Sequence, residues 1–327
     1  MQAATPPRTA DAADPARAIS RRPYPGAPLP APLPALDMQL LAELPSLELQ
    51  ARFLVQGFLS GLHRSPQKGS SVEFAEYRNY QLGDDPRRVD WRLYGRTDRL
   101  HVRQFEEETQ LRIFFVIDTS SSMDFRSGGA TLRKLELARV ALAGLGLIAQ
   151  RQRDAFGLAV AGAELDDFLP ARSSTAHWRR CVGRMESLPV GGRTALAATL
   201  TALAELLPSR SMVVIASDFY EEMEPLRSAL RRLRYDRHEL IGLHVLDPLE
   251  VDFDTADNGT FIDAETGGRL RLDPEAVRRG YLARFNAFCT ELDQCFHEAG
   301  GEVARLRSDQ PPVAALTAYL AQREERL

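Results

Sequence analysis

Short, continuous apolar runs alternate along most of the chain with longer segments in which apolar residues recur every three or four positions. The runs are rich in β-branched and aromatic residues, which is typical of strands buried on both faces of a parallel sheet. Four of them are expected to be central strands: Ile113–Ile117, Leu158–Val160, Met212–Ala216 and Leu240–Val245. The segments between them predict helices. This alternation predicts an α/β fold, with a doubly wound, mostly parallel sheet and helices on both faces.

The hydrophobic pattern divides the chain into three parts. Residues 1–36 are rich in Pro and Ala and bury too little apolar surface to offset the entropy of ordering, so we expect a disordered tail. Residues 37–110 form an N-terminal extension, in which apolar residues at helical spacing run from Met38 to Leu62 with a break expected at Pro45. Residues 111–327 hold the predicted sheet, including a β-hairpin excursion over 252–272.

The extension also contains a compact charged box, from Gly83 to Trp91, that reads GDDPRRVDW. Gly83 permits a turn, Pro86 suits the first position of a helix, and Trp91 offers an apolar anchor. Two interpretations stay open at this point. The box is either a structural element that joins the extension to the sheet or a surface that binds a partner.

Composition narrows the range of functions. The net charge of −4 gives no basic field that would attract nucleic acid or anionic lipid. No run approaches the ~20 apolar residues of a membrane span, and the N-terminus lacks the apolar core of a signal peptide. The three cysteines lack metal spacing, and the six scattered histidines form no His-x-x-x-His pair. We therefore expect a cytoplasmic protein with free thiols, no membrane span and no zinc centre.

The candidate chemistry follows the first central strand. Its apolar run stops at Asp118, and Ser120 and Ser122 then present two hydroxyls at alternate positions. Ligands bind at the carboxyl ends of strands in open α/β sheets, and such hard oxygen donors suit Mg²⁺. An Asp turn with serines capping the next helix would give the same pattern. Two further oxygen ligands favour the metal site: Thr194, which follows two glycines, and Asp218, which ends a second buried run.

These five positions, in this order, resemble the metal-ion-dependent adhesion site of von Willebrand factor A domains, which reads Asp-x-Ser-x-Ser, a distant Thr and a later Asp. The resemblance implies that Asp118, Ser120, Ser122, Thr194 and Asp218 hold Mg²⁺ or Mn²⁺ directly or through water. It also implies that an acidic side chain of a protein partner completes the coordination of the ion.

A longer stretch, from about residue 69 to residue 248, is similar to the bacterial "domain of unknown function 58" family. That family is a von Willebrand A-like domain with an N-terminal extension, often found beside MoxR-type AAA+ ATPases. Some of its members carry N-terminal membrane spans, where this chain has its Pro/Ala-rich tail. The following residues carry the resemblance: Gly69, Glu73–Arg78, Gly83–Arg87, Asp90–Trp91, Arg103, Asp118–Met123, Gly192–Leu196, Ser217–Phe219 and Asp247–Pro248.

The resemblance implies a non-catalytic, Mg²⁺-dependent protein-interaction module that acts as partner or adaptor of a MoxR-type ATPase in the assembly or maturation of other proteins. Ser121, Met123 and Arg193 lie beside the expected ligands and are candidate partner contacts. A metal-dependent phosphoester hydrolase is the alternative, but it needs a base or nucleophile beside the metal, and no histidine lies near these loops in sequence. A structural domain with a vestigial metal site is a third interpretation.

Overall fold

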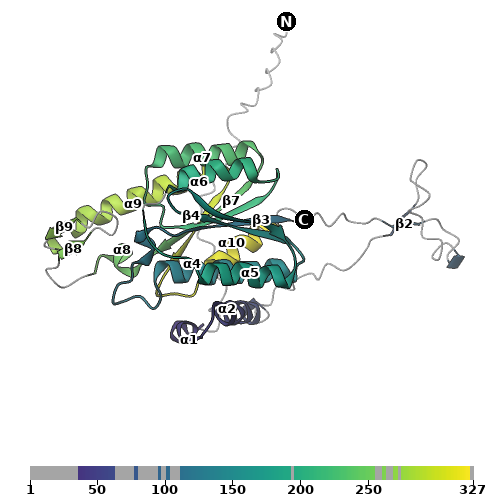
Figure 1. Cartoon of the computed structure of the whole chain (residues 1–327), viewed down its shortest axis with the longest axis horizontal. Helices are drawn as coiled ribbons and strands as arrows, with labels where there is room; N and C mark the ends of the chain where they lie inside the picture. The colour runs from purple at the N-terminus through teal and green to yellow at the C-terminus, as the bar shows by residue number, and fades with distance from the viewer. Residues whose placement is uncertain are drawn as a thin grey trace, which may run out of the picture.

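A six-stranded sheet forms the centre of the protein in the computed structural model (Figure 1). The structure describes residues 36–62, 77–79, 95–96, 101–103, 111–192, 195–254, 260–262, 268–271 and 274–324. The strand order is β10-β7-β6-β3-β4-β5, and every neighbouring pair is parallel except β4 and β5, which are antiparallel. The strands are β3 (Arg112–Asp118), β4 (Ala155–Ala161), β5 (Leu165–Arg172), β6 (Met212–Ser217), β7 (Glu239–Leu246) and β10 (Glu302–Arg307).

Helices cover both faces of this sheet, so both alternating sets of strand side chains are buried. The four predicted apolar runs all lie in β3, β4, β6 and β7, which confirms the predicted α/β fold class. One face is covered by α4, α5 and α10, and the other by α6, α7 and α9 (Figure 1). The bounds of these helices are α4 (Lys134–Arg151), α5 (Thr175–Glu186), α6 (Leu196–Leu206), α7 (Met223–Tyr235), α9 (Pro274–Glu298) and α10 (Val313–Glu324).

Two N-terminal helices, α1 (Met38–Glu43) and α2 (Leu47–Leu62), add an outer layer against α4 (Figure 1). Asp37 caps α1, and the chain becomes extended at Leu44, so the helices are separated at Pro45 as predicted. Residues 1–35 of the expected tail lie outside the described residues. Leu36, which the pattern assigned to that tail, is packed against the core.

Smaller elements lie outside the main sheet. β1 (Tyr77–Asn79) pairs with β2 (His101–Arg103), and β8 (Thr260–Ile262) pairs with β9 (Arg269–Arg271), both antiparallel. The second pair is the predicted hairpin excursion. It is preceded by a short helix, α8 (Pro248–Asp252), that the pattern did not predict. The charged box from residue 83 to residue 91 lies outside the described residues. In the described part of the chain, every helix is too short or too polar to cross a membrane.

Candidate metal and interaction site

The ends of β3 and β6 bring the two predicted acidic ligands to one edge of the sheet. These strands are parallel neighbours, with Ile117 beside Ala216, so Asp118 and Asp218 leave the sheet at the same edge. Both side chains are buried, with exposed fractions of 0% and 1%. Burial raises the pKa of the Asp118 carboxyl, and the negative charge of Asp218 raises it further. The two carboxylates therefore form a place where a cation is electrostatically favoured.

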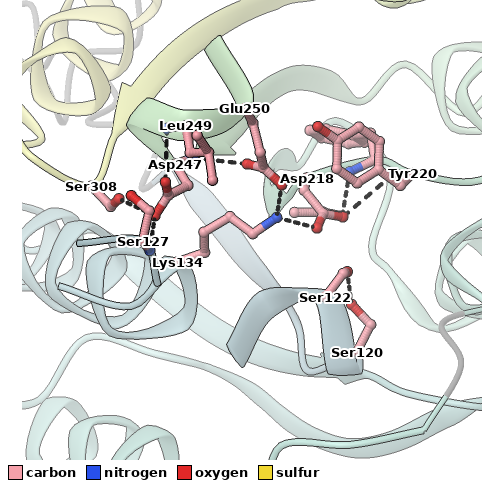
Figure 2. Close-up of polar contacts among 12 residues, drawn as sticks. Ser120, Ser122, Ser127, Lys134, Asp218, Tyr220, Asp247, Leu249, Glu250 and Ser308 are labelled. Carbon is pink, nitrogen blue, oxygen red and sulfur yellow. Dashed lines mark hydrogen bonds and ion pairs between the residues drawn. The ribbon is translucent and has the colours of Figure 1, made fainter. Parts of the chain in front are cut away.

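The loop after β3 turns its oxygen atoms inward. The backbone N–H of Ser120 donates to Asp118 Oδ1 over 2.9 Å, and the Ser217 hydroxyl donates to Asp118 Oδ2 over 2.6 Å. The hydroxyls of Ser120 and Ser122 lie 3.1 Å apart and form a hydrogen bond (Figure 2). Thus the structure brings together four of the five predicted ligands, Asp118, Ser120, Ser122 and Asp218. The fifth, Thr194, lies outside the described residues, as does Arg193.

The residues on either side of positions 193–194 are hydrogen-bonded to the loop after β3 and to the end of β4. The N–H of Gly191 donates to the Thr119 carbonyl, and the N–H and hydroxyl of Ser121 both donate to the Gly192 carbonyl. On the other side, the N–H of Ala195 donates to the Gly162 carbonyl, at the end of β4. The chain thus enters and leaves residues 193–194 beside the predicted metal ligands.

Two of the three candidate partner contacts, Ser121 and Met123, lie among the described residues. Ser121 is half-buried and belongs to the short 3₁₀ helix η3 (Ser121–Asp124), at the surface of the site. Met123, in the same helix, has an exposed fraction of 0% and packs in the core, so its prediction as a partner contact is wrong. The one-turn helix explains this, because it turns the Met123 side chain inward while its neighbours stay near the surface.

A hollow of about 370 Å³ lies beside this loop, lined by Ser121, Asp124, Phe125, Val190 and Gly191. Phe125 and Val190 are among the large apolar side chains that the structure leaves exposed, with exposed fractions of 38% and 37%. The hollow therefore adds an apolar surface next to the oxygen-rich loop.

A buried lysine lies against Asp218, and the sequence did not indicate it. The Lys134 side chain, from the first turn of α4, has an exposed fraction of 0%. Its Nζ lies 2.8 Å from Asp218 Oδ2 and 2.7 Å from Glu250 Oε1, and 5.2 Å from the centre of the Tyr220 ring (Figure 2). Burial alone would lower the pKa of Lys134, but the attraction of the two carboxylates outweighs it and raises that pKa. The ammonium is therefore charged.

Helix α8 holds Glu250 in position through a capping box. Asp247 Oδ1 accepts the N–H of Leu249, and Glu250 Oε2 accepts the N–H of Asp247 over 2.8 Å. Asp247 Oδ2 also accepts the N–H of Ser127 and the hydroxyl of Ser308, which connect the loop after β3 to the end of β10 (Figure 2). The sequence Asp247-Pro248-Leu249-Glu250 was the signal that could have revealed this helix start.

Glu221 is a further carboxylate at this edge that the sequence did not reveal. Its Oε2 accepts the N–H of Ala197, in the first turn of α6, over 3.3 Å, whereas its Oε1 is buried without a hydrogen-bond partner among the described residues. Burial raises the pKa of Glu221 to about 7, and the charge of Asp118 contributes to the rise. Among the described residues, carboxylates therefore outnumber ammonium groups at this edge, since Lys134 pairs with Asp218 and Glu250 but not with Asp118 or Glu221.

This arrangement fits a hard divalent cation only with the help of hydroxyl groups. Among the residues that the structure describes, no three His, Cys, Asp or Glu side chains converge closely enough to hold a metal by themselves. The converging hydroxyls of Ser120 and Ser122, together with Asp118, provide the hard oxygen donors that Mg²⁺ prefers. The Glu221 oxygen without a partner among the described residues, and the mutual repulsion of Asp118 and Asp218, are both compatible with additional positive charge at this edge.

Comparison with known proteins gives a family and a set of relatives. The family model described as "Protein of unknown function DUF58" matches residues 76–288. An uncharacterized protein of Mycobacterium tuberculosis (strain ATCC 25618 / H37Rv) is 32% identical over 295 residues, which are 88% of this chain and 90% of the relative. An uncharacterized protein of Mycobacterium avium is 28% identical over 162 residues, covering 47% of this chain and 93% of the relative.

Several solved structures are similar to about two thirds of this chain at low sequence identity. BatB from Bacteroides thetaiotaomicron is 14% identical, with a TM-score of 0.43, over 66% of this chain and 100% of that chain. An aerotolerance-related membrane protein from Bacteroides fragilis is 16% identical, with a TM-score of 0.43, over 65% and 99% of the two chains. The von Willebrand factor type A protein from Catenulispora acidiphila is 14% identical, with a TM-score of 0.36, over 68% and 42% of the two chains.

Proposed function

Because the chain belongs to the DUF58 family, whose description names no activity, we propose a function from the geometry of its site: a non-catalytic, Mg²⁺-dependent protein-interaction module. One observation carries this proposal. Two buried, mutually repelling carboxylates lie at the edge of the sheet beside two converging serine hydroxyls, and Lys134 neutralises only part of the negative charge.

Asp118, Ser120 and Ser122 would hold the ion directly or through water, and Thr194 completes the predicted set. When bound, Mg²⁺ (or Mn²⁺) supplies a coordination position for the acidic side chain of a protein partner. This chain's own groups fix the ligands: the Ser120 N–H and the Ser217 hydroxyl orient the Asp118 carboxylate, and Ser121 ties the loop to Gly192. Ser121 and the adjoining hollow, with exposed Phe125, would provide the surface around that acidic group, and Arg193 stays a partner contact predicted from sequence alone.

The same contacts weigh against phosphoester hydrolysis with Asp118 as nucleophile. Each oxygen of Asp118 already accepts a hydrogen bond, from Ser120 or from Ser217, and the carboxylate is buried. These contacts come from a backbone N–H and a serine hydroxyl, and neither supplies the general base that hydrolysis needs beside the metal. The interaction module is therefore the function that this geometry supports best.

The partner that we propose is a MoxR-type AAA+ ATPase, for which the protein would act as adaptor in the assembly or maturation of other proteins. The test is co-purification of the tagged full chain with a co-expressed MoxR-type ATPase, in buffer with Mg²⁺ and then with EDTA. We expect retention in Mg²⁺ and release by EDTA, and no retention by Asp118→Asn. Asp236→Asn is the control, because Asp236 precedes β7 at the opposite edge of the sheet. Retention that neither EDTA nor Asp118→Asn reduces would contradict the proposal.

A further inference from the structure

The buried ion pairs of Lys134 affect how any other cation can bind at this edge. A fully buried lysine is costly unless carboxylates compensate its charge, and here two of them contact its ammonium within 2.8 Å. The contacts join three segments that are distant in sequence: the first turn of α4, the end of β6 and helix α8 (Figure 2). Lys134 is therefore a structural part of this site, because its buried contacts hold three of its segments together.

Asp218 is the residue that the ammonium and a metal ion would both use. Its Oδ2 is paired with Lys134 over 2.8 Å, and its Oδ1 accepts the N–H of Tyr220 over 3.4 Å. A divalent ion that approached Asp218 would meet a fixed positive charge on the same carboxylate. Asp118, by contrast, accepts its hydrogen bonds from Ser120 and Ser217, and no cationic side chain among the described residues contacts it.

We propose that Lys134 is a resident cation of this site, which competes with a metal ion for Asp218 and leaves direct metal ligation to the other predicted ligands. The inference rests on the proposed function and deepens it, because it assigns the affinity of the site to a residue outside the ligand set. The lysine keeps the carboxylate cluster folded without a metal and lowers its affinity for Mg²⁺. This chain alone would then hold Mg²⁺ weakly, and the acidic side chain of a partner would supply the further ligand that makes binding tight.

Isothermal titration of the full chain with Mg²⁺ alone tests this role. Lys134→Met removes the ammonium and keeps a long side chain, so we expect Mg²⁺ to bind at least about tenfold more tightly than to the parent, which corresponds to about 1.4 kcal/mol. Glu250→Gln removes one of the two carboxylates that neutralise Lys134. The positive charge of Lys134 beside Asp218 is then less compensated, so we expect weaker Mg²⁺ binding. A merely structural role would not give these opposite signs, because loosening the same network should weaken binding in both variants.

Arg133→Met is the matched control. Arg133 is the neighbouring cation at the start of α4, but its side chain is 47% exposed and pairs with Asp124. Solvent screens an exposed charge, so this variant should bind Mg²⁺ within about twofold of the parent. An equal tightening in Arg133→Met and Lys134→Met would overturn the inference, because it would show an effect of net charge alone.

The remaining outcomes separate this inference from the proposed function. If the parent binds Mg²⁺ and Lys134→Met binds it no more tightly, the inference fails and the metal-dependent function stands. If only Lys134→Met binds Mg²⁺, the lysine is the resident cation and the metal-dependent function of the parent fails. No binding to any variant overturns both. Should Lys134→Met not fold, Glu250→Gln decides, and binding as tight as that of the parent contradicts the inference.

Discussion

The buried charged and titratable side chains of this protein are accommodated in two different ways. Lys134 stays charged because Asp218 and Glu250 contact its ammonium. His244, on β7, has an exposed fraction of 0% and lies against the rings of Phe219 and Phe288, with ring centres 5.9 and 5.8 Å away. Burial among aromatic rings favours the neutral form of His244, whereas two neighbouring carboxylates favour the charged form of Lys134.

His244 makes the free energy of unfolding depend on pH. The pKa of His244 is lowered to about 3, chiefly by burial and also by the charges of Arg305 and Lys134, while the charge of Asp218 opposes the shift. The unfolded chain takes up this proton near the ordinary pKa of about 6.5, whereas the folded chain does not. Stability is therefore lost as the pH falls from about 6.5 towards 3, by up to about 1.4 kcal/mol per pH unit through this proton.

We predict that His244→Leu removes this contribution. Urea unfolding at pH 7 and at pH 5 should show a smaller loss of unfolding free energy for the variant than for the parent, because leucine has no proton to bind. Equal losses in both proteins would contradict the assignment and would place the acid sensitivity in other residues.

At the scale of elements, helix α4 has hardly any exposed face. The sheet covers one side of it, and α2 covers the other, where a Cβ added to Gly144 would lie 3.0 Å from Leu54 Cδ2. A helix that is apolar around most of its circumference is buried on most sides. The N-terminal helices therefore complete the core over α4.

This packing predicts a large effect for a single side chain of α2. Leu54 has an exposed fraction of 0%, so Leu54→Ala should lower the unfolding free energy by about 2–5 kcal/mol through lost burial and a cavity. Leu49→Ala, at a position of the same helix that is 44% exposed, should change it by less than about 0.5 kcal/mol. Urea unfolding of both variants checks this, and a small effect of Leu54→Ala would mean that α2 does not fold with the sheet domain.

The central strands of the sheet, and the meeting of Asp118 and Asp218 at one edge, could be predicted from the sequence for a physical reason. Strands buried on both faces must be continuously apolar, and parallel neighbours end at the same edge, so Asp118 and Asp218 were expected together. The other charged groups around these two aspartates, Lys134, Glu250 and Glu221, could not be predicted from the sequence. Lys134 meets Asp218 and Glu250 across 84 and 116 positions of the chain, and Glu221 meets Ala197 across 24. No helical or strand period links residues so far apart.

At the scale of the whole molecule, the parallel sheet gathers its functional groups at one edge. The segments that follow β3, β6, β7 and β10 all lie there, and the hydrogen bonds that Asp247 accepts from Ser127 and Ser308 connect three of them. The proposed cation would therefore stabilise several segments at once. Its effect should appear in the melting of the whole domain.

Paired melting curves in EDTA and in Mg²⁺ test the central claim, that this edge binds a divalent cation through Asp118. At a hundredfold excess over the dissociation constant, Mg²⁺ should stabilise the parent by about 2.7 kcal/mol, which is roughly 5–10 °C in Tm. Asp118→Asn should gain almost nothing, because it removes the charge of a ligand, while Asp236→Asn should gain as much as the parent. An equal gain in all three proteins, or no gain in any, would contradict the account.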